Sequence, residues 1–399
     1  MNLYHRLIKF SKGDKIIIFF FISLILFYLF QLNRMHLANV ETAIAWWLFN
    51  YEGGIVRRGF TGTLLISLSH SLNFSLLKLL IIYQSLLFIT FISLFYFYIR
   101  KKNYKIFWLL LIIFSPVTFL VYVYDIFYIA RQELLLFIVF LIYLNFIINN
   151  KLNYKIAFIL SIFASLSLLS HEIFLFYISY FLTLHLLIYK KRDSFFYKKF
   201  IFFIFLPILS AITIFFYGVE FDGEIMCNKI IKAGIDESYC SSLLSHSHTS
   251  ILHSIKFTLQ HAIGQNYLYV YAPVLIISLL SFLFLVHSLK NKNFGIKKFL
   301  FVFIFNFIYS FPIFILVHDW GRYLYIHFTL LLIICIYYLP LRKNKISNFP
   351  IFSLNKIKNF ILIFFSLLFI LAWNSPHCCK NRVGLGAIDV IGNLFKKIN

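Results

Sequence analysis

The sequence predicts an all-α fold, a polytopic transmembrane helical bundle made of one integral membrane domain over residues 1–399. Of the 399 residues, 61% are hydrophobic and only 13% are charged, and the mean hydropathy is +0.87. A soluble domain carries about 25% charged residues. The apolar residues also gather in long stretches between basic segments, which is the pattern of helices that cross a bilayer.

Eleven apolar stretches are long enough, or nearly so, to cross the membrane as helices. They are 16–32, 79–99, 106–124, 134–149, 156–170, 173–189, 200–217, 268–288, 299–317, 323–341 and 359–373. The fifth and the last are short, so we expect either of them to tilt, re-enter or merge with a neighbour. The first follows four basic residues without a small-residue cleavage site, which predicts a retained span.

The basic residues predict a cytoplasmic N-terminus and a periplasmic C-terminus. With the N-terminus inside, the inner segments hold 24 of the 37 Lys and Arg, and the outer segments hold 12. Cytoplasmic loops of membrane proteins carry this excess of positive charge. The formal net charge of +23 is therefore a topology signal, and we expect no nucleic-acid partner. The Ile, Phe, Lys and Asn bias is typical of an AT-rich bacterial gene, so the predicted location is a bacterial inner membrane.

Acidic residues follow a different distribution. Of the 14 Asp and Glu, only Asp14 and Asp193 fall on the predicted inner side. Because acids contribute little to topology, their one-sidedness favours chemistry at the outer face. Two outer loops, 33–78 and 218–267, are the expected substrate-binding and lid elements. The second contains Cys227 and Cys240, which can form a disulfide in an oxidising compartment.

Each outer loop also contains an expected helix. A mostly apolar piece from Leu64 to Phe74 predicts a helix in the membrane interface. Apolar residues at helical spacing between 251 and 262 predict an amphipathic lid. Four histidines of this second loop lack a familiar metal-ligand spacing, so we expect no metal site. They are His246, His248, His253 and His261.

The first charged cluster combines Glu52 with Arg57, Arg58 and the glycines that follow. Guanidinium groups bind phosphate oxygens in a fork-shaped geometry, and glycines let backbone N–H groups approach an anion. Thr61 is the expected cap of the next helix. The cluster is a candidate diphosphate cradle, and the alternative is that both arginines contact lipid headgroups.

Three further clusters lie at predicted outer turns. Asp125 and Arg131-Gln132-Glu133 either bind substrate or only pair with one another. His171-Glu172 joins two short spans, and a carboxylate below the membrane surface is costly unless it is paired or used. His318-Asp319-Trp320-Gly321-Arg322 combines imidazole, carboxylate and guanidinium, with Trp320 as a surface for a sugar ring or an interface anchor.

An outer-face enzyme has no nucleotide substrates, and the sequence lacks the phosphate-loop, dinucleotide and nucleophile-elbow motifs. The activated compounds on that side are lipid-linked sugars. Their transfer needs cations for the diphosphate and a base for the acceptor hydroxyl. The candidate substrate-binding residues are Arg57, Arg58, Arg131, Arg322, Glu52, Asp125 and Trp320. The candidate bases are Glu172 and Asp319, oriented by His171 and His318.

The layout and four short stretches resemble bacterial O-antigen or repeat-unit polymerases and, more loosely, GT-C membrane glycosyltransferases. The stretches are Val56-Arg57-Arg58-Gly59, Arg131-Gln132-Glu133, His171-Glu172 and Asp319-Trp320-Gly321-Arg322. The resemblance implies polymerisation of undecaprenyl-diphosphate-linked oligosaccharides without a metal or another cofactor. It also implies a chain-length regulator protein as a candidate partner.

Three alternatives stay open. A GT-C enzyme that moves one sugar from a polyprenyl-phosphate donor is the nearest. The first outer loop holds only the separated Glu41 and Glu52, where metal-using GT-C enzymes carry an acidic pair or an Asp, which weakens this alternative. A flippase or transporter would place ionisable residues near the bilayer midplane, often in repeated halves. A structural membrane subunit would leave the outer clusters unexplained.

Overall fold

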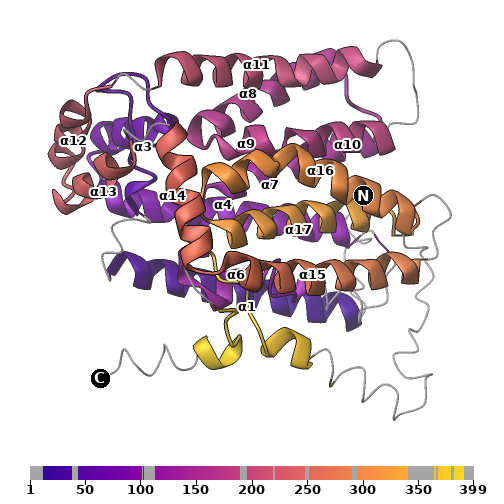
Figure 1. The fold of residues 1–399 in the computed structure, drawn as a ribbon. Coiled ribbons are helices and arrows are strands. Elements are labelled where there is room, and N and C mark those ends of the chain that lie inside the picture. The colour runs from indigo at the N-terminus through magenta and orange to yellow at the C-terminus, as the bar shows by residue number, and fades with distance from the viewer. Residues whose placement is uncertain are drawn as a thin grey trace, which may run out of the picture.

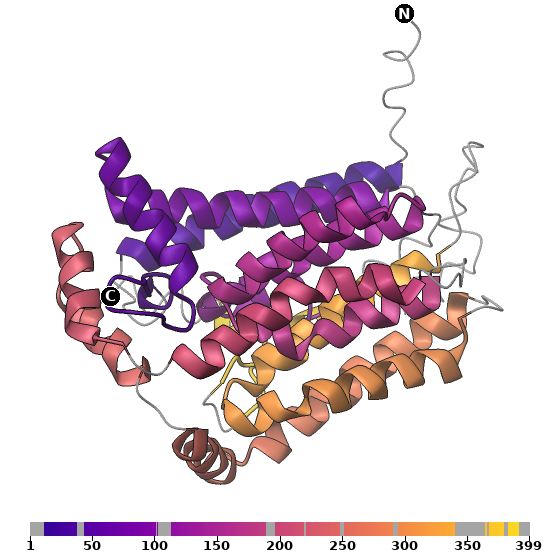
Figure 2. The same ribbon diagram turned by 90° about the horizontal axis from the view of Figure 1, so that it is seen from above.

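The computed structural model describes residues 12–37, 44–100, 102, 113–188, 196–218, 221–247, 251–289, 294–339, 364, 367–378 and 382–390. Across these residues the fold is helical without strands, and an isolated bridge joins Asn374 to Gly384. The longer helices lie side by side, and the shorter helices α3, α12, α13 and α14 gather at one end of them (Figures 1 and 2). We call this end the cluster end.

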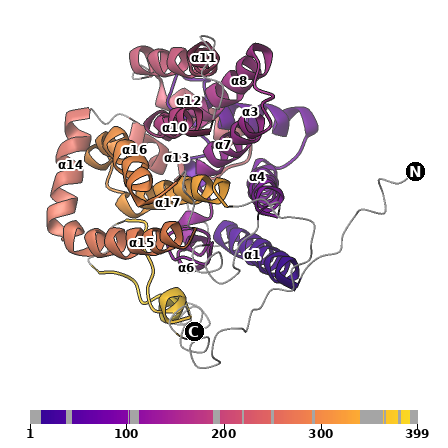
Figure 3. The same cartoon turned by 90° about the vertical axis from the view of Figure 1, so that its right-hand side faces the viewer.

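Among the described residues, six helices are long and apolar enough to cross a membrane, so the chain is a membrane protein. They are α1 (Lys12–Leu37), α4 (Leu76–Ile99), α11 (Phe196–Tyr217), α15 (Tyr267–Leu289), α16 (Ile296–Leu316) and α17 (Trp320–Tyr337). Helix α17 is almost entirely buried among its neighbours, in contact with α7, α15 and α16 (Figure 3). Its N-terminal turn therefore brings Asp319 and Arg322 to the middle of the cluster end.

Helices α8 (Tyr154–Ser170), α9 (Ile173–Phe176) and α10 (Ile178–Ile188) form a bent unit. The direction of the chain changes by 117° at the break between Ser170 and Ile173, as in a broken span or a re-entrant loop. This agrees with the expectation that the short fifth stretch departs from a simple crossing. The break carries His171 and Glu172.

Helix α7 (Glu133–Ile148) has only 16 residues. It packs against α4 and α8 and begins at the buried Glu133. The charged cluster of residues 125–133 therefore continues directly into a helix of the bundle.

The third predicted span, 106–124, is not a continuous helix in its described part. Residues 115–120 form turns, and they are followed by the short helix α6 (Val121–Tyr124) and a 3-10 turn at Ile126–Tyr128. Pro116 has no N–H for a helical hydrogen bond and restricts the residue before it, which explains the interruption. Residues 106–112 of this span lie outside the described residues, as do 359–363, 365 and 366 of the last predicted span, whose residues 367–371 are helical. The count of eleven spans and the direction of insertion stay predictions.

Both helices expected in the outer loops are present. Helix α3 (Gly59–Leu72) covers most of the apolar piece in the first loop, and α14 (Ile251–Gly264) is the amphipathic helix of the second. The second loop also contains α12 (Gly223–Lys232) and α13 (Ser238–Ser247), which precede α14 in the chain. Figure 1 shows α14 running across the direction of the long helices. If these helices cross the bilayer, α14 lies along its surface.

Serines of α8 form hydrogen bonds with α11 on both sides of a proline. Pro207 lies inside α11. The N–H of Leu206 donates to Ser161 Oγ at 3.2 Å, and the hydroxyl of Ser165 hydrogen bonds to that of Ser210. Side-chain hydroxyls of a neighbouring helix satisfy polar groups of this kind inside membranes. This contact fixes α8, and so the break at His171, against α11.

Candidate functional site

Arg58 begins helix α3 in a strained conformation. Its φ is 66°, in the left-handed region that non-glycine residues rarely adopt, and strain of this kind is common at functional sites. The guanidinium carbon lies 4.1 Å from the centre of the Trp46 ring, in a cation–π contact. The expectation that Thr61 caps α3 is wrong, because Thr61 lies within the first turn and donates to Ser170 Oγ at 2.8 Å. That bond ties α3 to the end of α8.

Arg58 also forms a two-pronged ion pair with Glu172. Its Nε donates to Oε2 at 2.8 Å, and its Nη2 donates to Oε1. Side-chain exposure is 12% for Arg58 and 25% for Glu172, so the pair lies at the rim of the bundle. Bidentate pairs of this type are the geometry by which arginine also binds phosphate. The first and third sequence clusters therefore meet in space.

Arg322 connects three more parts of the chain. Its Nη2 donates to His171 Nε2 at 2.6 Å, and its Nε donates to the carboxylate of Glu133. Its Nη1 lies 3.5 Å from Asp319 Oδ2. Arg322 and Glu133 are 5% and 1% exposed, so this ion pair is removed from water. Arg322 is enclosed by its partners and therefore holds Glu133, His171 and Asp319 close together.

Asp319 lies between two arginines and a histidine. Arg131 Nη1 is 4.0 Å from Asp319 Oδ2, and His318 Nε2 is 3.8 Å from Oδ1. Burial alone would raise the pKa of Asp319, but the positive charges around it, that of Arg131 above all, hold the pKa at about 2. Burial lowers the pKa of His318. Asp319 is therefore ionised near neutral pH and holds the side chains of Arg131 and Arg322 in place.

His377 is a member of the site that the sequence reasoning missed. Its Nδ1 lies 3.0 Å from Asp125 Oδ2, and its backbone N–H donates to the same oxygen at 3.4 Å. Its ring stacks on Phe127 with centroids 4.7 Å apart. The sequence signal that could have indicated His377 is the predicted topology, which places the segment after the last predicted span on the same side as the four clusters.

Gly321 explains how this C-terminal segment reaches the site. A Cβ at Gly321 would lie 1.8 Å from the carbonyl oxygen of Pro376, so only glycine allows the approach. The hydroxyl of Tyr271 also donates to Pro376 at 3.4 Å. The glycine of the 318–322 cluster thus positions the residue that precedes His377.

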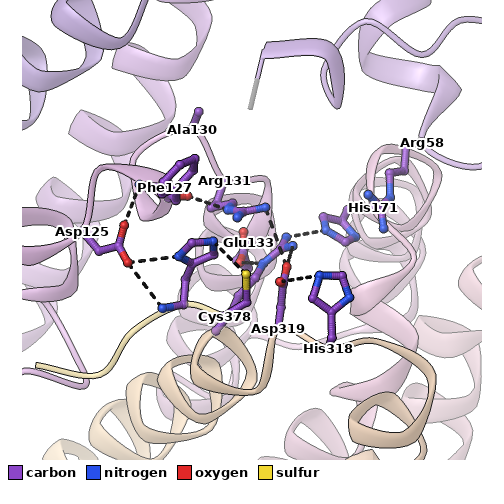
Figure 4. A network of polar contacts seen from close by, with 12 residues as sticks. Arg58, Asp125, Phe127, Ala130, Arg131, Glu133, His171, His318, Asp319 and Cys378 are labelled. Carbon is purple, nitrogen blue, oxygen red and sulfur yellow. Dashed lines mark hydrogen bonds and ion pairs between the residues drawn. The ribbon is translucent and has the colours of Figure 1, made fainter. Parts of the chain in front are cut away.

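Figure 4 shows how the side chains converge from the different elements. All four sequence clusters contribute to the charged network. We define this network as Arg58, Asp125, Arg131, Glu133, His171, Glu172, His318, Asp319, Arg322 and His377. It combines three guanidinium groups with four carboxylates, so an additional anion must compete with a carboxylate for an arginine.

Two predicted substrate-binding residues lie in other contacts. Glu52 pairs with Lys229 of α12 at 2.9 Å on the surface. Trp320 packs against Tyr267 and Tyr271 of α15, and its indole N–H donates to the backbone of α16. Helix packing therefore accounts for its position, as for an anchoring residue. Arg57 is half-buried beside Arg58.

Among the described residues, one trio of side chains has the spacing of a metal site. Ligand atoms of His318, Asp319 and Cys378 lie within 4.8 Å of one another. Cys378 is disulfide-bonded, which removes the thiolate that binds metals. Because Arg131 and Arg322 also lie beside Asp319, this trio is poorly suited to a cation.

The bundle contains an apolar cavity of about 510 Å³. It is lined by Phe60, Tyr83, Leu87, Thr90, Leu135, Ile138, Val139, Ile142, Phe146, Ile156, Ile159, Leu160, Phe163, Leu166, Ser167 and Ser170. Residues 156 to 170 of α8 span about 21 Å along the helix. Ile159 and Phe163 are 51% and 54% exposed, so the cavity opens toward lipid. Two of its lining residues, Phe60 and Ser170, are close in sequence to Arg58 and His171.

Helix α14 covers another side of the network. The ring of His261 lies 5.5 Å from that of His318, and Phe257 lies 5.3 Å from His318. On α14, Leu252 and Ile263 are 77% and 76% exposed. The helix therefore contacts the site and exposes apolar side chains, as expected for a lid at the membrane surface.

Cys227 of α12 and Cys240 of α13 lie side by side as buried free thiols in hydrogen-bond contact. Burial raises the pKa of Cys227 to about 12. The predicted disulfide between them stays a prediction.

Comparison of the chain with protein-family models, with curated proteins and with solved structures finds no match.

Proposed function

We propose that the chain is a glycosyltransferase that polymerises lipid-linked oligosaccharide repeat units at the periplasmic face of a bacterial inner membrane. Its substrate is an oligosaccharide on undecaprenyl diphosphate. The observation that carries the proposal is that Phe60 and Ser170, which line the apolar cavity, lie within two residues of Arg58 and His171 of the charged network in the chain. A prenyl diphosphate has an apolar chain attached to an anionic head. The apolar cavity matches the prenyl chain, and the arginines match the diphosphate.

The cavity supports a prenyl chain as its occupant. Along α7 it extends from Leu135 to Phe146, about 16 Å at 1.5 Å per residue. This is roughly half of the 30 Å hydrocarbon core, so the cavity covers about one leaflet. Its exposed rim at Ile159 and Phe163 gives a lipid lateral access from the bilayer.

Arg58 is the best-placed cation for the diphosphate. It precedes the cavity-lining residue Phe60 by two residues, and its fork-shaped N–H groups hold the carboxylate of Glu172. Glu172 is 25% exposed and Glu133 only 1%, so Glu172 is the carboxylate that phosphate oxygens can displace more easily. Arg57, next to Arg58 in the chain, supplies a second positive charge.

The reaction joins two repeat units. An acceptor hydroxyl attacks the anomeric carbon of the donor sugar, and the bond from this carbon to the diphosphate oxygen breaks. The hydroxyl proton passes to a base, and the undecaprenyl diphosphate leaves. Guanidinium groups stabilise the charge that develops on the leaving group. Arg322 contacts Glu133, Asp319 and His171 and holds these side chains in fixed positions.

Deletion of the gene in its host tests the proposal. The surface polysaccharide is separated on a gel, and the strain is complemented with the wild type, Arg58→Ala or Glu172→Ala. We expect the ladder to collapse to a single repeat unit, and we expect only the wild type to restore it. A complete ladder that lacks one sugar would favour the single-sugar GT-C transferase instead. Loss of all polysaccharide, with lipid-linked units retained inside, would favour a flippase.

A further inference from the structure

The proposed transfer needs a group that accepts the proton of the incoming hydroxyl. Two of the candidates predicted from the sequence are already engaged. Both carboxylate oxygens of Glu172 receive N–H bonds from Arg58. The Nε2 of His171 receives an N–H from Arg322, and since arginine is only a donor, this bond uses the Nε2 lone pair. The Nε2 lone pair of His171 is therefore occupied, and the ion pair with Arg58 stabilises the Glu172 carboxylate as an anion, which makes it a weaker base.

The candidates on the other side of Arg322 are also poor bases. An efficient base has a pKa near the working pH. Neighbouring positive charges outweigh burial and hold the pKa of Asp319 at about 2, so this carboxylate rarely accepts a proton near neutral pH. Burial lowers the pKa of His318, whose ring packs against His261 and Phe257.

His377 has the geometry that the other groups lack. The Asp125 carboxylate is 4% exposed and accepts from the His377 backbone N–H, while its Oδ2 lies 3.0 Å from Nδ1. A carboxylate on Nδ1 fixes the imidazole tautomer and leaves the Nε2 lone pair to accept a proton. Stacking on Phe127 holds the plane of the ring.

The contact of Nε2 with Cys378 agrees with this assignment. Cys378 Sγ lies 3.2 Å from His377 Nε2. Because Cys378 is disulfide-bonded, its sulfur has no proton to donate, and the lone pair of Nε2 is kept. The imidazole is 12% exposed, which leaves a path for a hydroxyl group.

We propose that His377, oriented by Asp125, is the general base of the transfer, an inference that rests on the proposed function. The acceptor hydroxyl gives its proton to His377 Nε2 as its oxygen bonds to the anomeric carbon. The imidazolium then formed is stabilised by Asp125 through Nδ1–H. Departure of the diphosphate balances the reaction, and the proton is later released to water.

The ionisable groups around His377 come from three elements. Asp125 and Arg131 lie on the segment before α7, and His318 and Asp319 lie on the turn before α17. Cys378 follows His377 in the C-terminal segment. A general base accepts a proton only in its unprotonated form, so we expect the rate to fall toward acid pH.

The test uses the purified full-length protein in lipid nanodiscs. The substrate is the pool of lipid-linked repeat units extracted from cells that lack the gene. We expect His377→Gln to lower kcat by about 100-fold or more with little change in KM. We expect His377→Gly to regain activity with added imidazole, a rescue that a purely structural role would not give. Asp125→Asn should lower kcat, because it permits the wrong tautomer.

The matched control is His287→Gln, which changes an exposed histidine at the far end of α15 and should keep the wild-type rate and pH profile. The inference is overturned if the wild type is active and His377→Gln keeps its rate within about threefold with an unchanged pH profile. A failed imidazole rescue of a protein that elutes normally would also count against it. A wild type without any activity on these lipids would instead refute the proposed function.

Discussion

Arg322 is the most enclosed of the network arginines, and its ion pair with Glu133 illustrates how a buried charge acts at the scale of one residue. Removing one partner leaves the other charge buried without compensation, which costs about 3–5 kcal/mol. We therefore expect Glu133→Gln and Arg322→Met each to lower the melting temperature of the detergent-solubilised protein strongly. The measurement is thermal unfolding followed by size-exclusion chromatography.

The surface pair Glu52–Lys229 provides the control for this prediction. Both side chains are about 40% exposed, and such pairs contribute at most about 1 kcal/mol. Lys229→Met should therefore leave the melting temperature almost unchanged. Equal losses of stability in Lys229→Met and Arg322→Met would contradict the view that Arg322 is held by a desolvated network.

The second residue-scale prediction concerns acid stability. The pKa of Asp319 is lowered from 3.8 to about 2 in the folded protein. A lowered pKa means that the ionised carboxylate stabilises the fold, by about 2 kcal/mol, at every pH above its unfolded pKa. This contribution is lost only as the pH falls from about 4 toward 2.

The measurement compares the melting temperatures of the wild type and Asp319→Asn across this pH range. We expect a constant difference between pH 7 and 5, and a difference that shrinks below pH 4. A difference that disappears already near pH 6 would show that another group controls the stability of the network.

At the scale of elements, α4, α7 and α8 form the apolar cavity, and its volume can be reduced without touching the charged residues. Ile142 lies on α7 and lines the cavity. Ile142→Trp should fill part of it and raise the KM for the lipid-linked substrate at least about tenfold, because a displaced prenyl chain loses about 0.8 kcal/mol for each buried CH₂ group.

Ile304→Trp is the matched control. Ile304 is 50% exposed on α16, outside the cavity, so the same change should have little effect on KM. The assay is the nanodisc reaction with extracted lipid-linked repeat units. Equal KM values for the two variants would show that the cavity does not hold the substrate chain.

The elements also show what sequence patterns can and cannot establish. Hydropathy located α7, α8, α10, α11, α15, α16 and α17 closely, and the spacing of apolar residues located α14, because both signals are local. The break at Pro116 and the 117° bend at His171 were harder to predict from the sequence. A run of apolar residues does not indicate where a membrane helix turns back, since tertiary contacts such as those between α8 and α11 decide it.

For the whole molecule, the four charged clusters form one site although about 260 residues separate Arg58 from Arg322. The sequence predicted the residue types and a common side, but the pairing of Arg58 with Glu172 or of Arg322 with Glu133 depends on helix packing. His377 was missed because its chemistry depends on Asp125, a partner 252 residues away. Trp320 was assigned to substrate, and helix contacts now account for its position.

The central claim is that the apolar cavity and the arginines together bind one lipid diphosphate. Photo-crosslinking tests it most directly, with a polyprenyl diphosphate that carries a photoreactive group on its prenyl chain and the full-length protein in nanodiscs. We expect labelled peptides from residues 135–146 and 156–170, competition by unlabelled undecaprenyl diphosphate, and strongly reduced labelling in Arg58→Ala. Labelling confined to the lipid-exposed faces of α15 and α16, unaffected by the competitor or by Arg58→Ala, would contradict the account.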